Sequence, residues 1–248
     1  KPLSAKLSLT GIICPDGEIA RSKTDIANAL AEGWSPTFNN AVPIDNDKAD
    51  AILSEFSAPF DFSEARVPGR AEIRESLRRV KNSAPGPDGI PFAGWKATGE
   101  LGIETLTLTL EHALAGGEFD DHWNDSLAVF LPKDLNAEPS GNDKDILRKT
   151  SDTRPLNLKN SDNKIVGGAL NFSCKSVLTK SACEVQRGFI PRRQLIQNVI
   201  DLDLRAHIYS LSSPALLLPL LVFFDFAAAF PSVSHAWLTK VLIALGFP

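Results

Sequence analysis

The sequence predicts an α+β fold that is rich in helices. Apolar residues recur at helical spacing in several segments, and 70–81 and 100–115 show the pattern most clearly. Shorter apolar runs at 127–131 and 216–226 are typical of strands. The chain has 248 residues and a hydrophobic content of 43%, which is enough to bury a core.

The charge balance excludes a wholly basic protein that coats nucleic acid. The net charge is −4, but positive residues are concentrated in the middle of the chain. Segment 66–96 has seven Lys or Arg against three Asp or Glu, and segment 133–193 has twelve against seven. Any phosphate-binding surface is therefore expected to be local. The three cysteines form no Cys-x-x-Cys motif, so neither a zinc knuckle nor a disulfide framework is indicated.

Residues 1–65 are predicted to be a helical N-terminal extension. One short helix is expected after Thr24-Asp25 and another after Asp47, because apolar residues follow each at helical spacing. Trp34 and Phe38 are expected between these helices, with a packing role. The extension shows no residues that indicate chemistry.

Segment 70–81 predicts an amphipathic helix with a basic ridge. Arg70, Arg74 and Arg78 stand four residues apart on one face, which is consistent with a phosphate-binding surface or with an ordinary solvated face. The loop 83–91 that follows contains prolines, which restrict φ, and glycines, which permit tight turns. We therefore expect a rigid loop.

Segment 100–115 predicts a core helix, and two strands are expected to follow it. The first strand, 127–131, ends at Pro132-Lys133, and the second, 153–158, begins at Thr153-Arg154. The polar segment 134–152 between them is expected to be an exposed loop. In the core helix, the residues expected to be buried are Ile103, Leu106, Leu110 and Leu114.

The last third of the chain is predicted to form two helices, a buried strand and a final helix. The helices are expected at about 161–180 and 195–209, and Phe189 between them is expected to fill part of the core. The strand, 216–226, is apolar except for Asp225. A lone carboxylate at the end of such a strand is costly unless a metal ion or a cation meets it, although capping of the next turn is an alternative.

Several segments together resemble the reverse transcriptase domains of non-LTR retroelements. Asp225 is followed by three residues, Ala229-Phe230, and then Val-x-His-x-x-Leu at 233–238, which is similar to the first palm motif of that family. Upstream, Ala-Pro-Gly-Pro-Asp-Gly at 84–89 resembles the start of these domains. Pro132-Lys133, Arg154-Pro155 and Gln-Arg-Gly-Phe at 186–189 match further family segments in the same order.

The resemblance implies a partial right-hand polymerase fold with an RNA-directed DNA polymerase activity. It implies helix-rich fingers with a short β-hairpin at 66–214, and the first palm strand and helix at 215–248. The partners would be an RNA template, a DNA primer and a deoxynucleoside triphosphate. The expected location is nuclear or cytoplasmic, with no membrane and no secretion.

The resemblance also assigns roles to particular residues. Asp225 would be the catalytic carboxylate and would bind two Mg²⁺ ions, with the main-chain carbonyl of Phe226 completing one coordination shell. Lys133 and Arg154 would bind the triphosphate from opposite arms of the hairpin. The remaining nucleotide contacts would come from Phe226, Ala229 and Phe230, of which Phe230 would exclude a 2′-hydroxyl, and the template contacts from Arg192 and Arg193.

Two departures from the family pattern leave an alternative open. Ala228 and Pro231 stand where many members carry polar residues, and the family's aromatic-x-Asp-Asp motif is absent from the 248 residues. We therefore expect this chain to be a fragment without polymerase activity of its own. The alternative is a non-catalytic relic of a retroelement that acts as an RNA-binding or interaction module.

Overall fold

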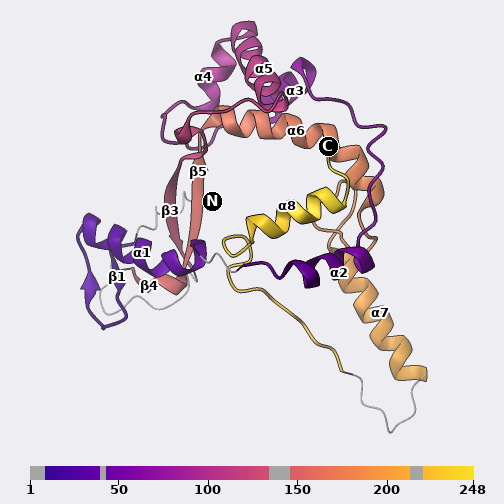
Figure 1. Ribbon diagram of the computed structural model, residues 1–248. Helices are drawn as coiled ribbons and strands as arrows, with labels where there is room; N and C mark the ends of the chain where they lie inside the picture. The colour runs from indigo at the N-terminus through magenta and orange to yellow at the C-terminus, as the bar shows by residue number, and fades with distance from the viewer. Residues whose placement is uncertain (1–8, 40–42, 134–145, 213–219) are drawn as a thin grey trace, which may run out of the picture. The chain divides into compact units, whose positions relative to one another are not determined.

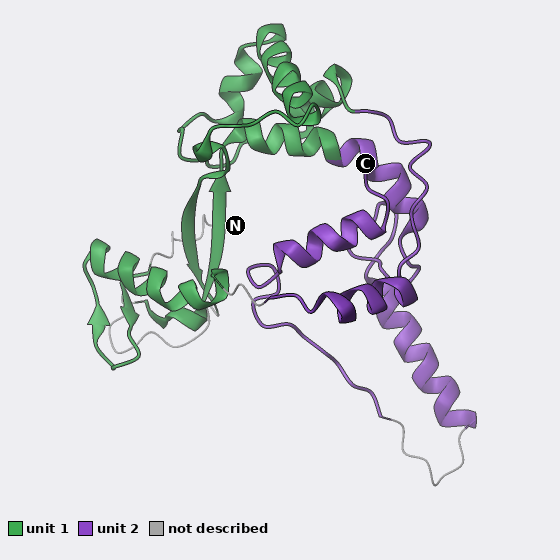
Figure 2. Ribbon diagram, viewed as in Figure 1, with its two compact units in different colours: residues 1–42, 68–170 green, residues 43–67, 171–248 purple. Residues whose placement is uncertain are grey.

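The computed structural model describes residues 9–39, 43–133, 146–212 and 220–248 (Figure 1). Helices and short strands occur together, which confirms the α+β fold class. Two compact units are present, one from residues 1–42 and 68–170 and the other from 43–67 and 171–248 (Figure 2). These boundaries are not those of the predicted extension, fingers and palm. That functional division stays a prediction, because compactness alone does not test it.

The first unit begins with a small N-terminal layer. It contains β1 (Gly11–Ile13), β2 (Ile19–Ala20) and α1 (Lys23–Phe38). The hydroxyl of Ser22 accepts a hydrogen bond from the Asp25 N–H and so caps α1. A later strand, β4 (Leu147–Lys149), pairs with β1 in parallel, whereas β2 pairs with β1 antiparallel. Trp34 and Phe38 lie inside α1, so the prediction that they lie between two helices is wrong.

A two-stranded hairpin leads from this layer to a group of helices (Figure 1). It consists of β3 (Ser126–Pro132) and β5 (Thr153–Lys159), which confirms both predicted strands. At one end of the hairpin, Ser126 lies opposite Lys159, whose ammonium binds the main-chain carbonyl of Asn124 at 3.2 Å. At the other end, a 3-10 turn, η2 (Thr150–Asp152), joins β4 to β5.

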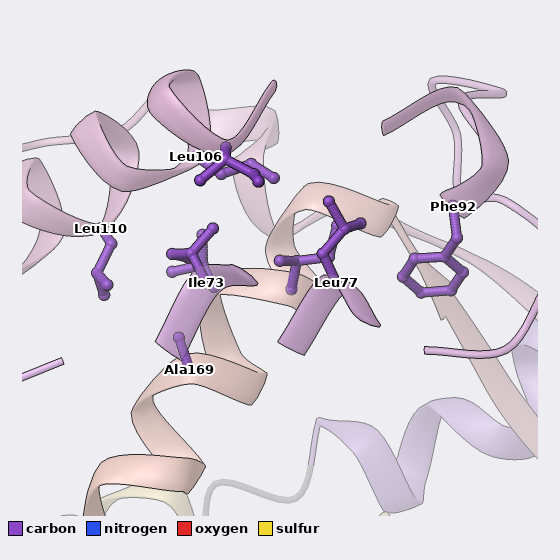
Figure 3. Close-up of a cluster of buried hydrophobic side chains, with 9 residues drawn as sticks. Ile73, Leu77, Phe92, Leu106, Leu110 and Ala169 are labelled. Carbon is purple, nitrogen blue, oxygen red and sulfur yellow. The ribbon is translucent and has the colours of Figure 1, made fainter. Parts of the chain in front are cut away.

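The core of the first unit lies between helices (Figure 3). These are α3 (Arg70–Arg79), α4 (Phe92–Ala97), α5 (Glu100–Leu114) and the first half of α6 (Ser161–Ser181). The sequence predicts three of these helices, but not α4. Of the residues that it places in the core of α5, only Leu114 is exposed, at 46%. The buried cluster comprises Ile73, Leu77, Phe92, Ile103, Leu106, Leu110, Ile165, Val166 and Ala169.

The loop at 84–89 packs against the junction between β5 and α6. The Asp88 N–H donates a hydrogen bond to Asn160 Oδ1 at 3.2 Å, and the Ser161 hydroxyl donates to the Ile90 carbonyl at 2.7 Å. A Cβ on Gly86 would lie only 2.3 Å from the main-chain nitrogen of Asn160. Burial raises the pKa of Asp162, and the neighbouring Asp88 carboxylate contributes to this shift. The loop is therefore held in one position, as the sequence predicts.

The arginines of α3 are neutralised by carboxylates within the first unit. Arg70 and Arg74 both bind Glu100 of α5 at 2.7 Å, and Arg78 binds Glu75 at 2.8 Å. Hydrogen bonds from Arg78 and Arg79 lower the pKa of Glu75 to about 2. These ion pairs favour the second interpretation of this face of α3, an ordinary solvated face, over a phosphate-binding surface.

The second unit contains α2 (Asn46–Phe56), α7 (Ile196–Ser212) and α8 (His235–Ala244). Phe60 and Phe62 pack near Phe247, with ring centroids 6.5 and 4.8 Å away, and Lys240 of α8 binds Asp50 of α2 at 2.8 Å. No residue of α7 is buried. None of the helices in the described residues is both long enough and apolar enough to cross a membrane.

Candidate functional site

The hairpin brings Lys133 and Arg154 to the same end. Arg154 is the second residue of β5 and lies opposite Leu131 in the antiparallel register. Lys133 follows the last residue of β3, and its N–H donates a hydrogen bond to the Asp152 carbonyl at 2.7 Å. The two cations therefore stand on opposite arms of one hairpin end, which is the arrangement expected from the sequence.

The two cations have different surroundings. The ammonium of Lys133 donates to the Ser151 carbonyl at 2.6 Å, and Arg148 Nε donates to the Lys133 carbonyl at 3.3 Å. Arg154 is exposed, and the structure records no hydrogen bond or ion pair for its guanidinium within the described residues. A lysine ammonium has three N–H donors and a guanidinium has five. Among the residues that the structure describes, most of the donors of this pair therefore have no protein acceptor.

Two buried residues next to the cations were not predicted to belong to the site. Trp34 of α1 donates from Nε1 to the hydroxyl of Thr153 at 3.0 Å, across 119 residues of sequence. Thr153 is fully buried and is the direct neighbour of Arg154. The only sequence signal for Trp34 is a single Trp between two predicted helices, for which a packing role is the ordinary explanation.

The prediction of a buried strand that ends at Asp225 is wrong for described residues 220–226. They have no strand conformation, and Phe223 and Phe224 are 77% and 88% exposed. A strand is stabilised by hydrogen bonds to a neighbouring strand. None of the described strands pairs with this segment. Asp225 is exposed, and its Oδ1 accepts a hydrogen bond from the Phe226 N–H at 2.9 Å, which fits the alternative of a local cap.

The predicted nucleotide contacts after Asp225 lie in and beside a turn. Phe226 and Phe230 are 79% and 84% exposed, and Ala229 is exposed as well. Between them Ala228 has a positive φ of 52°, and its carbonyl accepts a hydrogen bond from the Ser232 N–H at 3.0 Å. The turn leads into α8, which is capped by the Ser234 hydroxyl. The contacts themselves stay predictions.

The described residues contain no group of three or more His, Cys, Asp or Glu side chains that could hold a metal ion. Asp225 is one carboxylate, and with the Phe226 carbonyl it offers only part of a two-metal donor set. The magnesium site therefore stays a prediction.

Arg192 and Arg193 have different environments in the second unit. Arg193 donates to the Thr179 carbonyl in the last turn of α6 at 3.3 Å, and to the carbonyls of Ala182 and Gln186, which follow the helix, at 3.0 Å each. The bond to Thr179 reaches a carbonyl in the last turn, where the helix itself supplies no partner. Arg192 is exposed, has a positive φ of 64°, and has no recorded partner within the described residues. Its guanidinium is available for a phosphate contact, whereas that of Arg193 is mostly engaged.

The prediction that Phe189 fills part of the core is wrong. This residue has a positive φ of 62° and is 98% exposed. The nearby Arg187 binds Asp201 of α7 at 2.6 Å and is largely buried instead.

Comparison with known proteins identifies no family for the chain. A scan against protein-family models finds no match, and a search of curated proteins also finds none. The resemblance to reverse transcriptases therefore depends on the quoted segments alone, and the activity that it implies is a proposal.

Proposed function

We propose that the chain is part of an RNA-directed DNA polymerase of the non-LTR retroelement type. The observation that carries the proposal is the register of the hairpin, in which Arg154 lies opposite Leu131 and Lys133 follows on the same arm as Leu131. A triphosphate carries about four negative charges, which two cations on facing arms can bind together. The ordered segments at 84–89, 154–155, 186–189 and 225–238 support the same conclusion.

The two cations have complementary roles in this proposal. The guanidinium of Arg154 presents a planar fork that can donate two parallel hydrogen bonds to phosphate oxygens. The ammonium of Lys133 is a compact charge that retains two N–H donors after its bond to the Ser151 carbonyl. The arginine orients the phosphate chain, and the lysine neutralises it.

Asp225 and Phe230 would belong to the palm part of the proposed polymerase. Asp225 and the Phe226 carbonyl would hold Mg²⁺, which would stabilise negative charge on the attacking and leaving oxygens of nucleotidyl transfer. Phe230 would pack against the sugar and exclude a 2′-hydroxyl. Both side chains are exposed, and are thus accessible to a nucleotide.

Template binding is assigned to Arg192, and it can be tested with an RNA–DNA primer–template hybrid. Filter binding over a salt series is expected to show a linear fall of log affinity with log salt. Arg192→Ala should weaken binding to all hybrid sequences alike and reduce this slope by about 1. Arg70→Ala is the matched control, because Arg70 is already paired with Glu100, and it should leave the slope unchanged.

The same experiment separates the proposal from its alternatives. If the chain does not bind the hybrid even at low salt, its nucleic-acid role is removed, and the interaction module becomes the better interpretation. If binding is salt-dependent but Arg192→Ala and Arg70→Ala give the wild-type slope, the assignment of Arg192 is wrong.

A further inference from the structure

A buried hydrogen bond joins α1 to the cationic end of the hairpin. Trp34 Nε1 donates to Thr153 Oγ1 at 3.0 Å, and the two residues are 7% and 0% exposed. Thr153 immediately precedes Arg154 and lies opposite Pro132, which immediately precedes Lys133. The bond therefore reaches the residues next to both cations.

The hydroxyl of Thr153 continues this connection into η2. It accepts from Trp34 and donates its own proton to the Thr150 carbonyl at 2.7 Å, so both of its hydrogen-bonding roles are used. The same short turn holds Lys133 through the Asp152 and Ser151 carbonyls. A displacement of Thr153 is thus expected to move Arg154 directly and Lys133 through η2.

Helix α1 lies directly against this turn. A Cβ on Gly33 would be 2.5 to 2.7 Å from the side-chain atoms of Thr150, so the surfaces meet without room for a larger residue. A two-stranded hairpin is marginally stable alone, and in the described residues β3 and β5 form a sheet without a third strand. The position of its end is therefore set by what contacts it, which is α1 through η2, together with Arg148 of β4.

We infer that Trp34 is a positioning residue, which holds Arg154 and Lys133 at the separation needed to bind one polyphosphate chain. The inference rests on the proposed function and deepens it, because it makes the N-terminal layer part of the polyphosphate site. The ligand class is a linear polyphosphate or a nucleoside triphosphate. Trp34 does not contact the ligand, but acts through Thr153 and η2.

The test uses the whole chain and inorganic tripolyphosphate, titrated by calorimetry. Trp34→Phe removes the N–H donor and keeps most of the packing, and it should weaken binding about fivefold or more, the effect of one lost buried hydrogen bond. Trp95→Phe is the matched control. Trp95 also lies in the first unit, and its Nε1 is buried without a hydrogen-bond partner among the residues that the structure describes. This control should bind as the wild type does.

A second pair of variants keeps the test valid if Trp34→Phe does not fold. Thr153→Ser retains the hydroxyl and should bind nearly as the wild type, whereas Thr153→Val removes it and should weaken binding like Trp34→Phe. The third comparison is made in an Arg154→Ala background. There the effect of Trp34→Phe should be smaller than in the wild type, because one of the two groups that Trp34 positions is gone.

The possible outcomes distinguish a failure of the proposed polyphosphate site from a failure of the positioning role of Trp34. If the wild-type chain does not bind tripolyphosphate, the polyphosphate site of the proposed function fails and the inference fails with it. If the wild type binds and Arg154→Ala weakens binding, but Trp34→Phe and Thr153→Val do not, only the inference is overturned. A Trp34→Phe effect of full size in the Arg154→Ala background would also overturn it, because Trp34 would then act through general stability.

Discussion

Gly86→Ala is expected to destabilise the first unit by about 2 kcal/mol or more, the cost of overpacking against atoms that cannot move freely. The added Cβ would lie 2.3 Å from the Asn160 main-chain nitrogen and 2.4 Å from Asn160 Oδ1. Relief requires the loop to move away, which breaks the bond from the Asp88 N–H to Asn160. Thermal and urea unfolding, followed by circular dichroism, would measure the change.

Gly167→Ala is the control for this substitution. Gly167 lies inside α6, and a Cβ there would have no neighbour within 4 Å. This change should stabilise the protein by roughly 0.5–1 kcal/mol, because alanine loses less conformational freedom than glycine in a helix. If the Gly86→Ala protein is as stable as the wild type, the loop does not pack closely against Asn160, before the start of α6.

Leu110→Ala is expected to reduce the free energy of unfolding of the first unit by about 2–5 kcal/mol, the range for a buried leucine that leaves a cavity. Leu110 is 0% exposed and belongs to the same buried cluster as Ile73, Leu106 and Ala169 (Figure 3). Because the core is assembled from different helices, the loss should appear in the unfolding of the whole unit. Urea titration with tryptophan fluorescence would follow it.

Leu108 provides a matched comparison on the same helix. It stands two residues earlier in α5 and is 60% exposed. Leu108→Ala should change stability by less than about 0.5 kcal/mol, as for most surface substitutions. Equal effects of the two substitutions would mean that α5 does not present the face described above to the core.

The helices could be predicted from the sequence because their signals are local. The spacing of Ile73 and Leu77 identifies the buried face of α3, and the residues around Asp162 mark the start of α6. The strands β1, β2 and β4 were not predictable, because two or three residues are too few to show a period. Their existence depends on pairing between Gly11 and Leu147, which are far apart in the chain.

The strand predicted at 216–226 fails for a related reason. An apolar run predicts burial only if other parts of the chain cover it, and periodicity cannot report whether they do. In the structure, Leu221 and Phe224 are 59% and 88% exposed and unpaired within the described residues. Residues 213–219, which include the first part of the predicted strand, lie outside the described residues.

The candidate site was predictable only in part. The flanking prolines and strand patterns indicated that Lys133 and Arg154 stand on adjacent hairpin arms, and the register agrees. Trp34 could not be connected to them, because its partner Thr153 is 119 residues away. The bonds from Arg193 to carbonyls in and after the last turn of α6 could not be predicted either, since they depend on how the chain turns after this helix.

The most direct test of the central claim is the affinity of the chain for a deoxynucleoside triphosphate compared with the corresponding monophosphate. We expect the wild type to prefer the triphosphate. The Lys133→Ala, Arg154→Ala double variant should lose about 100-fold in triphosphate affinity, the effect of two charge-assisted hydrogen bonds. Monophosphate affinity should change little. Equal triphosphate affinities of the wild type and the double variant would contradict the account, because the hairpin end would then not be the phosphate site.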